Sequence, residues 1–217
     1  MKLFIDSGNI KDIETLVGIG IIDGVTTNPT LLAKEPGDYR ENLKRICQIV
    51  KGPVSGEVTA TDFAGMISQG HDIARIDEHM IVKVPLTRDG IKACKSLSGE
   101  GIRVNVTLCF SAAQALLAAK AGATFVSPFV GRLDDIATNG MDLIREIVDI
   151  YSNYDFATEV LVASCRHPIH VTEAARMGAD IATCPPAVID QMFNHPLTSI
   201  GLEKFLKDWE KSQAVKA

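Results

Sequence analysis

The chain lacks the sequence features that direct a protein into a membrane, onto a nucleic acid or out of the cell. It has no apolar run approaching the length of a membrane span. Its N-terminus, "MKLFID", turns acidic at once and lacks the charged, apolar and small-residue order of a signal peptide. The net charge is -5, from 22 basic and 27 acidic residues. This charge disfavours general nucleic-acid binding but allows a local basic pocket for a small anion.

The sequence is also poor in features of disulfide-rich, metal-binding and dinucleotide-binding proteins. The five cysteines are an odd number, scattered, with no CxxC pair, which indicates reduced thiols and a cytoplasmic protein. The same spacings disfavour a zinc site. His167 and His170 are three residues apart, but no third ligand lies near them in the sequence. We therefore predict no metal site and a cytoplasmic location.

Short β-rich runs alternate along the whole chain with longer segments of helical periodicity. No linker, low-complexity segment or short repeat interrupts this alternation, and 217 residues suffice for one large core. Strands are predicted at residues 2–6, 24–29, 54–60, 79–85, 102–108, 123–129, 158–164 and 180–184. Helices are predicted at 9–20, 38–51, 62–76, 88–101, 111–122, about 139–153, 168–178 and 186–194, with a tail helix at about 199–213.

This alternation predicts an α/β fold, a single (β/α)8 TIM barrel that spans residues 1–217 with an additional C-terminal helix. A doubly wound open sheet is the alternative. Because no GxGxxG follows the first predicted strand, the dinucleotide-binding version of that alternative is disfavoured.

Polar residues recur at every second position near the ends of the predicted strands. Lys83 is the most unusual of them, because Met80, Ile81 and Val82 precede it and Val84 follows it. In a barrel, alternate residues of a strand face the interior, and active sites form at the carboxyl ends of the strands. The other polar positions are Asp6, Thr26 and Asn28, Ser55 and Glu57, Asn105 and Thr107, Ser127 (followed by Phe129), and Ser164 and Arg166.

This set of side chains suggests Schiff-base chemistry on a phosphorylated carbonyl compound. Desolvation disfavours the charged form of an amine, and a neutral amine such as that of Lys83 can attack a carbonyl carbon. A nearby carboxylate can move the protons that imine formation requires. Arg132 and Arg166 at the rim can hold a phosphate.

Purely structural interpretations of the same residues stay open. Lys83 could form a structural ion pair with Glu57, and Asp6 could cap the following helix. Asn28, before a proline, could be a turn residue. Arg132 could be solvated after a glycine turn.

Five motifs, in order along the chain, resemble the small transaldolases, a family that also includes fructose-6-phosphate aldolase. They are "GVTTNPTLL" (24–32), "VKVPLT" (82–87), "VNVTL" (104–108), "AAKAGATFVSPFVGRLDD" (118–135) and "LVASCRHPIHV" (161–171). The resemblance covers nearly the whole chain, from "KLFIDSGN" to "KFLKDWEK". It departs from the family pattern at Ser7-Gly8, in place of a threonine-rich turn, and at Cys165, which lies between Ser164 and Arg166.

The resemblance implies a role for each candidate residue. Lys83 would form an imine with a ketose phosphate, Asp6 would act as acid and base, and Glu57 with Thr107 would position a water. Its implied substrate-binding residues are Thr27, Asn28, Asn105, Ser127, Phe129, Arg132, Ser164 and Arg166. No metal or organic cofactor is implied, because the lysine is the electron sink.

The resemblance further implies the reaction and the assembly. Glutamate at position 57 and phenylalanine at position 129 match the transaldolase branch, whereas the aldolase branch has glutamine and tyrosine there. We therefore expect transfer of dihydroxyacetone from fructose 6-phosphate or sedoheptulose 7-phosphate to erythrose 4-phosphate or glyceraldehyde 3-phosphate. The open alternatives are an aldolase that releases free dihydroxyacetone and a non-catalytic phosphate-binding barrel. Relatives of this length form pentamers or decamers, so a homo-oligomer is expected.

Overall fold

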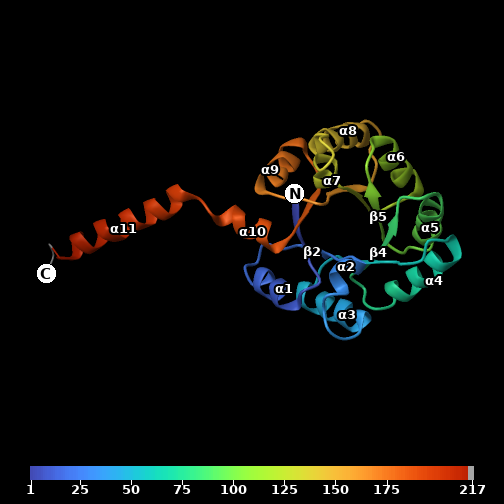
Figure 1. The fold of residues 1–217 in the computed structure, drawn as a ribbon, viewed down its shortest axis with the longest axis horizontal. Helices are drawn as coiled ribbons and strands as arrows, with labels where there is room; N and C mark the ends of the chain where they lie inside the picture. Colours follow the sequence, from blue (N-terminus) through green and yellow to red (C-terminus); the bar gives the residue numbers. More distant parts are fainter. Residues whose placement is uncertain (215–217) are drawn as a thin grey trace.

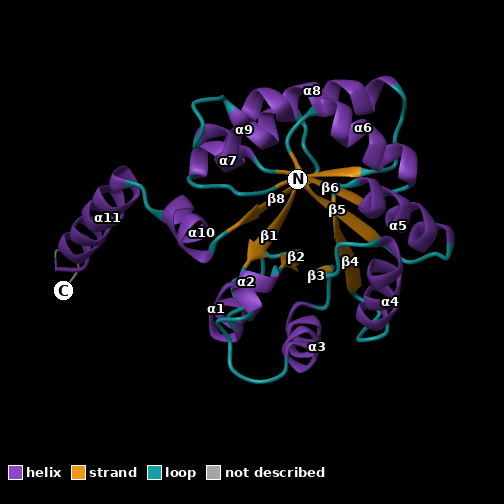
Figure 2. Cartoon of the chain, turned by 45° about the vertical axis from the view of Figure 1, so that its right-hand side comes forward, coloured by secondary structure: helices purple, strands orange, loops and turns teal. Residues whose placement is uncertain are grey.

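The structure, a computed structural model, describes residues 1–214, in which eight parallel strands close into a barrel surrounded by helices (Figures 1 and 2). The strands are paired in sequence order, and the first strand also pairs with the eighth. The predicted (β/α)8 barrel with a C-terminal helix is therefore confirmed, and the open sheet is excluded because a doubly wound sheet has two unpaired edges.

The elements follow the predicted order, with two short helices added. The strands are β1 (Lys2–Asp6), β2 (Gly24–Thr26), β3 (Val54–Glu57), β4 (Met80–Pro85), β5 (Val104–Cys109), β6 (Phe125–Pro128), β7 (Glu159–Val162) and β8 (Ile181–Cys184). The helices are α1 (Ile10–Val17), α2 (Pro29–Leu32), α3 (Tyr39–Val50), α4 (Phe63–Ala74), α5 (Arg88–Gly99), α6 (Ala112–Ala121), α7 (Val130–Asp134), α8 (Gly140–Asn153), α9 (Pro168–Met177), α10 (Pro186–Phe193) and α11 (Pro196–Ala214).

Several predicted boundaries of strands and helices were wrong. The strand predicted at 24–29 ends at Thr26, because Asn28 accepts the Leu31 N–H and caps α2. The strand predicted at 54–60 ends at Glu57. The tail helix predicted at 199–213 begins three residues earlier, at Pro196, a residue that suits the first helical turn.

Two apolar clusters form the core, one inside the barrel and one between the strands and the helices. The inner cluster comprises Phe4, Ile81, Phe125, Leu161, Ala163 and Ile181, with Phe129 packed against it. The rings of Phe4 and Phe125 meet edge to face, with centroids 6.1 Å apart. Gly24 supplies no side chain here, since a Cβ would lie 2.6 Å from the Phe4 ring. This apolar layer closes the barrel interior beneath the polar residues that follow it.

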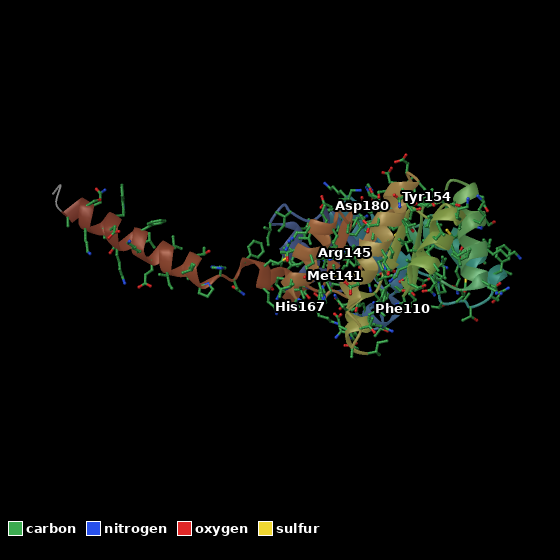
Figure 3. The ribbon with its side chains drawn as sticks, turned by 90° about the horizontal axis from the view of Figure 1, so that it is seen from above. Phe110, Met141, Arg145, Tyr154, His167 and Asp180 are labelled. Carbon is green, nitrogen blue, oxygen red and sulfur yellow. The ribbon has the colours of Figure 1, made fainter. Side chains whose placement is uncertain are left out.

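The two ends of the barrel are formed by different sets of loops (Figure 3). Phe110 and His167, which follow β5 and β7, lie at one end, whereas Tyr154 and Asp180, which precede β7 and β8, lie at the other. α11 extends away from the barrel in Figures 1 and 3, and none of its residues is buried. Within residues 1–214, no helix combines the length and apolar character needed to cross a membrane.

Candidate active site

A cavity of about 210 Å³ opens at the carboxyl ends of the strands. Part of its polar floor follows directly from strand alternation, because several floor residues come two positions after an inner-core residue. Asp6 follows Phe4, Lys83 follows Ile81, and Ser127 follows Phe125. The lining residues are Asp6, Thr26, Asn28, Lys83, Thr107, Ser127, Phe129, Arg132, Leu161, Ala163, Ser164, Arg166 and Thr183.

Lys83 is buried, and its ammonium group has two compensating partners. Its Nζ lies 3.0 Å from a carboxylate oxygen of Glu57 and donates to the main-chain carbonyl of Thr27 at 2.9 Å. Strand pairing explains the ion pair, since Glu57 and Lys83 are direct partners in the β3–β4 register. Burying a cation without such partners would cost several kcal/mol. The ion pair that the sequence left open is therefore present, at the edge of the cavity that Lys83 lines.

Asp6 lies across the same cavity at the end of β1. Burial raises the pKa of its carboxyl group, while the Thr26 hydroxyl and the charge of Lys83 act in the opposite direction. Thr26 Oγ1 lies 2.8 Å from Asp6 Oδ1 and 2.7 Å from Thr183 Oγ1. A carboxyl group whose pKa is raised can exchange protons nearer to neutral pH, as an acid–base catalyst requires. Asp6 does not cap α1, because Asn9 does.

Thr107 presents a buried hydroxyl to the cavity, and this hydroxyl has no hydrogen-bond partner within residues 1–214. The next residue, Leu108, has a φ of 58°, and the β5–β6 register shifts between Val106 and Cys109. A left-handed conformation is unfavourable for leucine and is typical of functional sites when it occurs. An unpaired buried hydroxyl is costly unless a water or ligand satisfies it, so Thr107 marks a polar position inside the cavity.

Asn105 and Thr27 are buried beside the cavity but are not among its lining residues. The Asn105 amide donates to Ser55 Oγ at 3.2 Å and accepts the Ser127 hydroxyl at 2.7 Å, so it fixes the orientation of Ser127. The Thr27 hydroxyl donates to the Ser55 carbonyl at 2.7 Å. Thr27 points away from the interior because neighbouring strand residues face opposite sides. Only its carbonyl reaches the site, through Lys83.

Two arginines line the outer part of the cavity. Arg132, on α7, has its guanidinium carbon 5.4 Å from the centroid of the Phe129 ring. Arg166, in the loop between β7 and α9, pairs with Asp135 at 2.7 Å and is half exposed. Ser164 of the same loop has a φ of 60°, an unusual conformation for serine. The cavity therefore has a cationic outer end suited to a phosphate.

The structure brings nine of the twelve predicted site residues to one cavity. Glu57 contacts it only through Lys83, and lines a neighbouring cavity of about 620 Å³ together with Pro29, Leu32 and Gln69. Thr26 and Thr183 line the cavity but were not predicted as site residues. Strand alternation could have indicated that Thr183 faces the barrel interior, since it follows Ile181 by two positions on β8.

No group of three or more histidine, cysteine, aspartate or glutamate side chains in the described part of the chain could hold a metal ion. His170 instead pairs with Asp134, and its ring packs on His167 with centroids 3.8 Å apart. The five cysteines are free and buried.

Comparison with known proteins identifies relatives along the whole chain. The profile of the family described as "Transaldolase/Fructose-6-phosphate aldolase" matches residues 3–216. A protein of Methanococcus vannielii named "Probable transaldolase" is 59% identical over 210 residues, 97% of this chain and 98% of the relative. Proteins with the same name from Kosmotoga olearia and Nitrosopumilus maritimus are each 57% identical, over 97% and 99% of this chain and 97% of each relative.

Proposed function

Because the chain belongs to the transaldolase/fructose-6-phosphate aldolase family, we propose that it is a transaldolase of the non-oxidative pentose phosphate pathway. It transfers a dihydroxyacetone unit from fructose 6-phosphate or sedoheptulose 7-phosphate to erythrose 4-phosphate or glyceraldehyde 3-phosphate. One observation carries the proposal: a buried lysine lies beside a carboxylate in a cavity that also holds Asp6 and two arginines.

Lys83 forms the covalent intermediate. Its Nζ attacks C2 of the ketose phosphate, the carbinolamine loses its hydroxyl group as water, and an iminium ion results. Glu57, 3.0 Å from Nζ, takes up and returns the protons that these steps need. The unpaired Thr107 hydroxyl holds the water through which those protons move. The iminium is the electron sink, so the proposed chemistry uses no metal or organic cofactor.

Asp6 controls the cleavage of the C3–C4 bond. It accepts the proton of the C4 hydroxyl while the bonding electrons move into the iminium, which leaves an enamine on Lys83 and releases an aldose phosphate. Its raised pKa supports both directions of this proton transfer, because the carboxyl group must also return the proton to the acceptor aldehyde.

The remaining polar residues orient the two ends of the substrate. Asn28 and Ser127 contact the dihydroxyacetone unit from the cavity wall, and Asn105 supports it through its bond to Ser127. Thr27 contributes by holding Lys83 through its carbonyl. Arg132, Ser164 and Arg166 bind the phosphate.

Glu57 and Phe129 favour the transferase over the aldolase. A transferase must keep the enamine unprotonated until an acceptor arrives, which an apolar wall supports by limiting water. The Phe129 ring supplies such a wall, packed on the inner core cluster and edge to face with Phe110 at 5.9 Å.

Product analysis tests this proposal. The protein is incubated with fructose 6-phosphate, with and without erythrose 4-phosphate, and glyceraldehyde 3-phosphate is measured. We expect sustained release only with the acceptor, together with sedoheptulose 7-phosphate. Equal release without acceptor and accumulation of free dihydroxyacetone would establish the aldolase instead. Lys83→Met should lose at least about 10³-fold in turnover and form no borohydride-trapped adduct. Ligand binding without any adduct in the unaltered protein would indicate the non-catalytic barrel.

The proposal includes the compartment and the assembly. The five free, buried cysteines fit a reducing compartment, the cytoplasm. Residues 1–217 act as one domain that forms a pentamer or decamer. The apolar side chains that α11 exposes, Leu202, Phe205, Leu206 and Trp209, support contacts with a neighbouring subunit.

A further inference from the structure

His170 lies outside the cavity but is bonded to the loop that forms its cationic end. The side chain is buried on α9, and its Nδ1 lies 3.2 Å from the main-chain nitrogen of Arg166. Its Nε2 lies 3.0 Å from a carboxylate oxygen of Asp134, on α7. The imidazole ring therefore bridges the loop of one phosphate-site arginine and the helix that carries the other, Arg132.

The partners of the ring determine its protonation. A main-chain N–H can only donate, so Nδ1 of His170 accepts and carries no proton. Nε2 then carries the proton and donates to Asp134. Burial and the adjacent His167 lower the pKa of His170, while Asp134 and Glu173 act in the opposite direction, and the net lowering favours the neutral ring. A neutral ring with its proton on Nε2 can accept the Arg166 N–H and donate to Asp134 at the same time.

We infer that His170 is a positioning residue for phosphate binding, which holds the main chain of Arg166 at the correct distance from α7 through its Nδ1. This inference rests on the proposed function of the same site. It assigns His170 no contact with the substrate, because the cavity is lined by Ser164 and Arg166 and not by His170.

Other contacts also join the α7 segment to the loop that carries Ser164 and Arg166. Gly131 N–H donates to the Ser164 carbonyl at 3.2 Å, and Asp135 holds the Arg166 guanidinium. The guanidinium bond is half exposed, so under the proposed function an incoming phosphate competes with Asp135 for the Arg166 guanidinium. The buried bond from His170 to the Arg166 main chain does not depend on that side chain, so it can hold the loop while the guanidinium changes partner.

A simpler interpretation is that His170 only stabilises the first turn of α9. It occupies the third helical position after the N-cap residue His167, where side chains often accept a bond from the chain before the helix. That role would alter folding stability alone. A positioning role also predicts weaker binding of phosphorylated ligands, with chemistry at Lys83 preserved.

Two substitutions, each of which mimics one ring nitrogen of His170, distinguish the role of Nδ1 from that of Nε2. Asparagine places an oxygen near the position of Nδ1, and glutamine places an amide nitrogen near the position of Nε2. His170→Gln thus loses the bond to Arg166, and His170→Asn retains it. We expect His170→Gln to raise both KM for fructose 6-phosphate and Kd for inorganic phosphate about tenfold, the effect of one buried hydrogen bond. We expect kcat, and His170→Asn, to stay within about threefold of the unaltered protein.

The readouts are steady-state kinetics, titration calorimetry with inorganic phosphate, and borohydride trapping of free dihydroxyacetone at Lys83. Dihydroxyacetone carries no phosphate, so its trapping should be unchanged in His170→Gln. The control is His71→Asn, which removes an exposed bond of 2.7 Å between His71 Nε2 and the Glu100 carboxylate far from the cavity. If His170→Gln does not fold, His170→Ala, which also removes the acceptor of the Arg166 N–H, should raise the phosphate Kd about tenfold.

Unchanged phosphate affinity in a folded His170→Gln variant would overturn the inference, as would equal losses in the asparagine and glutamine variants. Failure of the proposed function has a different signature, because the unaltered protein would then show no turnover and no trapped adduct. Phosphate calorimetry needs no turnover, so it still compares the variants in that case.

Discussion

At the scale of single residues, the site holds a carboxyl group in an environment that disfavours its charge. Burial raises the pKa of Asp6 above 3.8, the value it has in an unfolded chain. The folded state therefore binds a proton more tightly than the unfolded state. The stabilising effect of that proton is complete below pH 3.8 and is lost as the pH rises through the folded-state pKa. At neutral pH the charged Asp6 side chain thus lowers the free energy of unfolding.

The substitution Asp6→Asn tests this cost and the catalytic role together. Asparagine keeps an oxygen for the Thr26 hydroxyl but carries no charge. We expect the melting temperature at pH 7 to rise by roughly 2–4 °C, the equivalent of about 1 kcal/mol in a chain of this size. Turnover should fall about 10²–10⁴-fold. Thermal melts from pH 8 down to about pH 4 should show the difference shrinking as the pH falls toward 3.8, the value in an unfolded chain.

The control for this prediction is Asp72→Asn on the protein surface. Asp72 pairs with Arg40 in an exposed bridge, so its substitution should change stability by less than about 1 kcal/mol. If Asp6→Asn melts below the unaltered protein at pH 7, the charged Asp6 carboxylate does not destabilise the folded state.

At the scale of elements, the short helix α7 supplies one side of the phosphate site, and a glycine allows its close approach. A Cβ at Gly131 would lie 2.3 Å from the Ser164 carbonyl oxygen and 2.7 Å from Arg166 Nε. Both atoms belong to the loop that carries the proposed phosphate-binding residues. Any larger residue at position 131 must therefore move α7 away from that loop.

Gly131→Ala should destabilise the protein by about 1–3 kcal/mol through overpacking, and should raise KM for fructose 6-phosphate more than it lowers kcat. Chemical denaturation and steady-state kinetics measure the two effects. Gly99→Ala is the matched control, because a Cβ there meets no atom within 4 Å and the residue ends helix α5. That variant should be neutral or slightly stabilised. Normal KM and stability in Gly131→Ala would show that α7 tolerates displacement.

The sequence predicts the regular elements well and the short ones poorly, for a physical reason. The strands are short apolar runs and the long helices repeat apolar residues on one face, and both patterns follow from burial. α2 and α7 have four and five residues, too few for a helical period to be recognised. Asn28 followed by Pro29 did carry a signal for α2, since asparagine is a frequent N-cap and proline a frequent first helical residue.

Strand alternation likewise predicted which residues share the barrel interior, but not how deep each lies or what it contacts. The sequence left the Glu57–Lys83 ion pair open as one interpretation, and the β3–β4 register establishes it. The contacts of Arg166 with Asp135 and His170 depend on how a loop packs on α7. The positive φ angle of Ser164 has no sequence signal, because serine rarely adopts it. Tertiary packing decides these features.

At the scale of the whole molecule, α11 is the helix that does not pack on the barrel. Its 19 residues include no buried side chain, and the helix lies apart from the barrel in Figure 1. The sequence left open whether this helix packs on its own barrel. The structure excludes that for the described residues, since Phe205 and Trp209 remain 70% and 64% exposed.

The double substitution Phe205→Glu with Trp209→Glu should therefore dissociate the proposed oligomer. Aromatic side chains dominate such interfaces, and burying a carboxylate in their place costs several kcal/mol. Size-exclusion chromatography with light scattering should give a pentamer or decamer for the unaltered chain and mostly monomers for the variant. Lys204→Gln with Lys211→Gln lowers the net charge of the same helix by the same two units, and this control should assemble normally. Because α11 contributes no residue to the cavity, the dissociated variant should still form a borohydride-trapped adduct at Lys83. An unaltered chain that is monomeric, or a double variant that assembles as the unaltered chain does, would contradict the role given to α11.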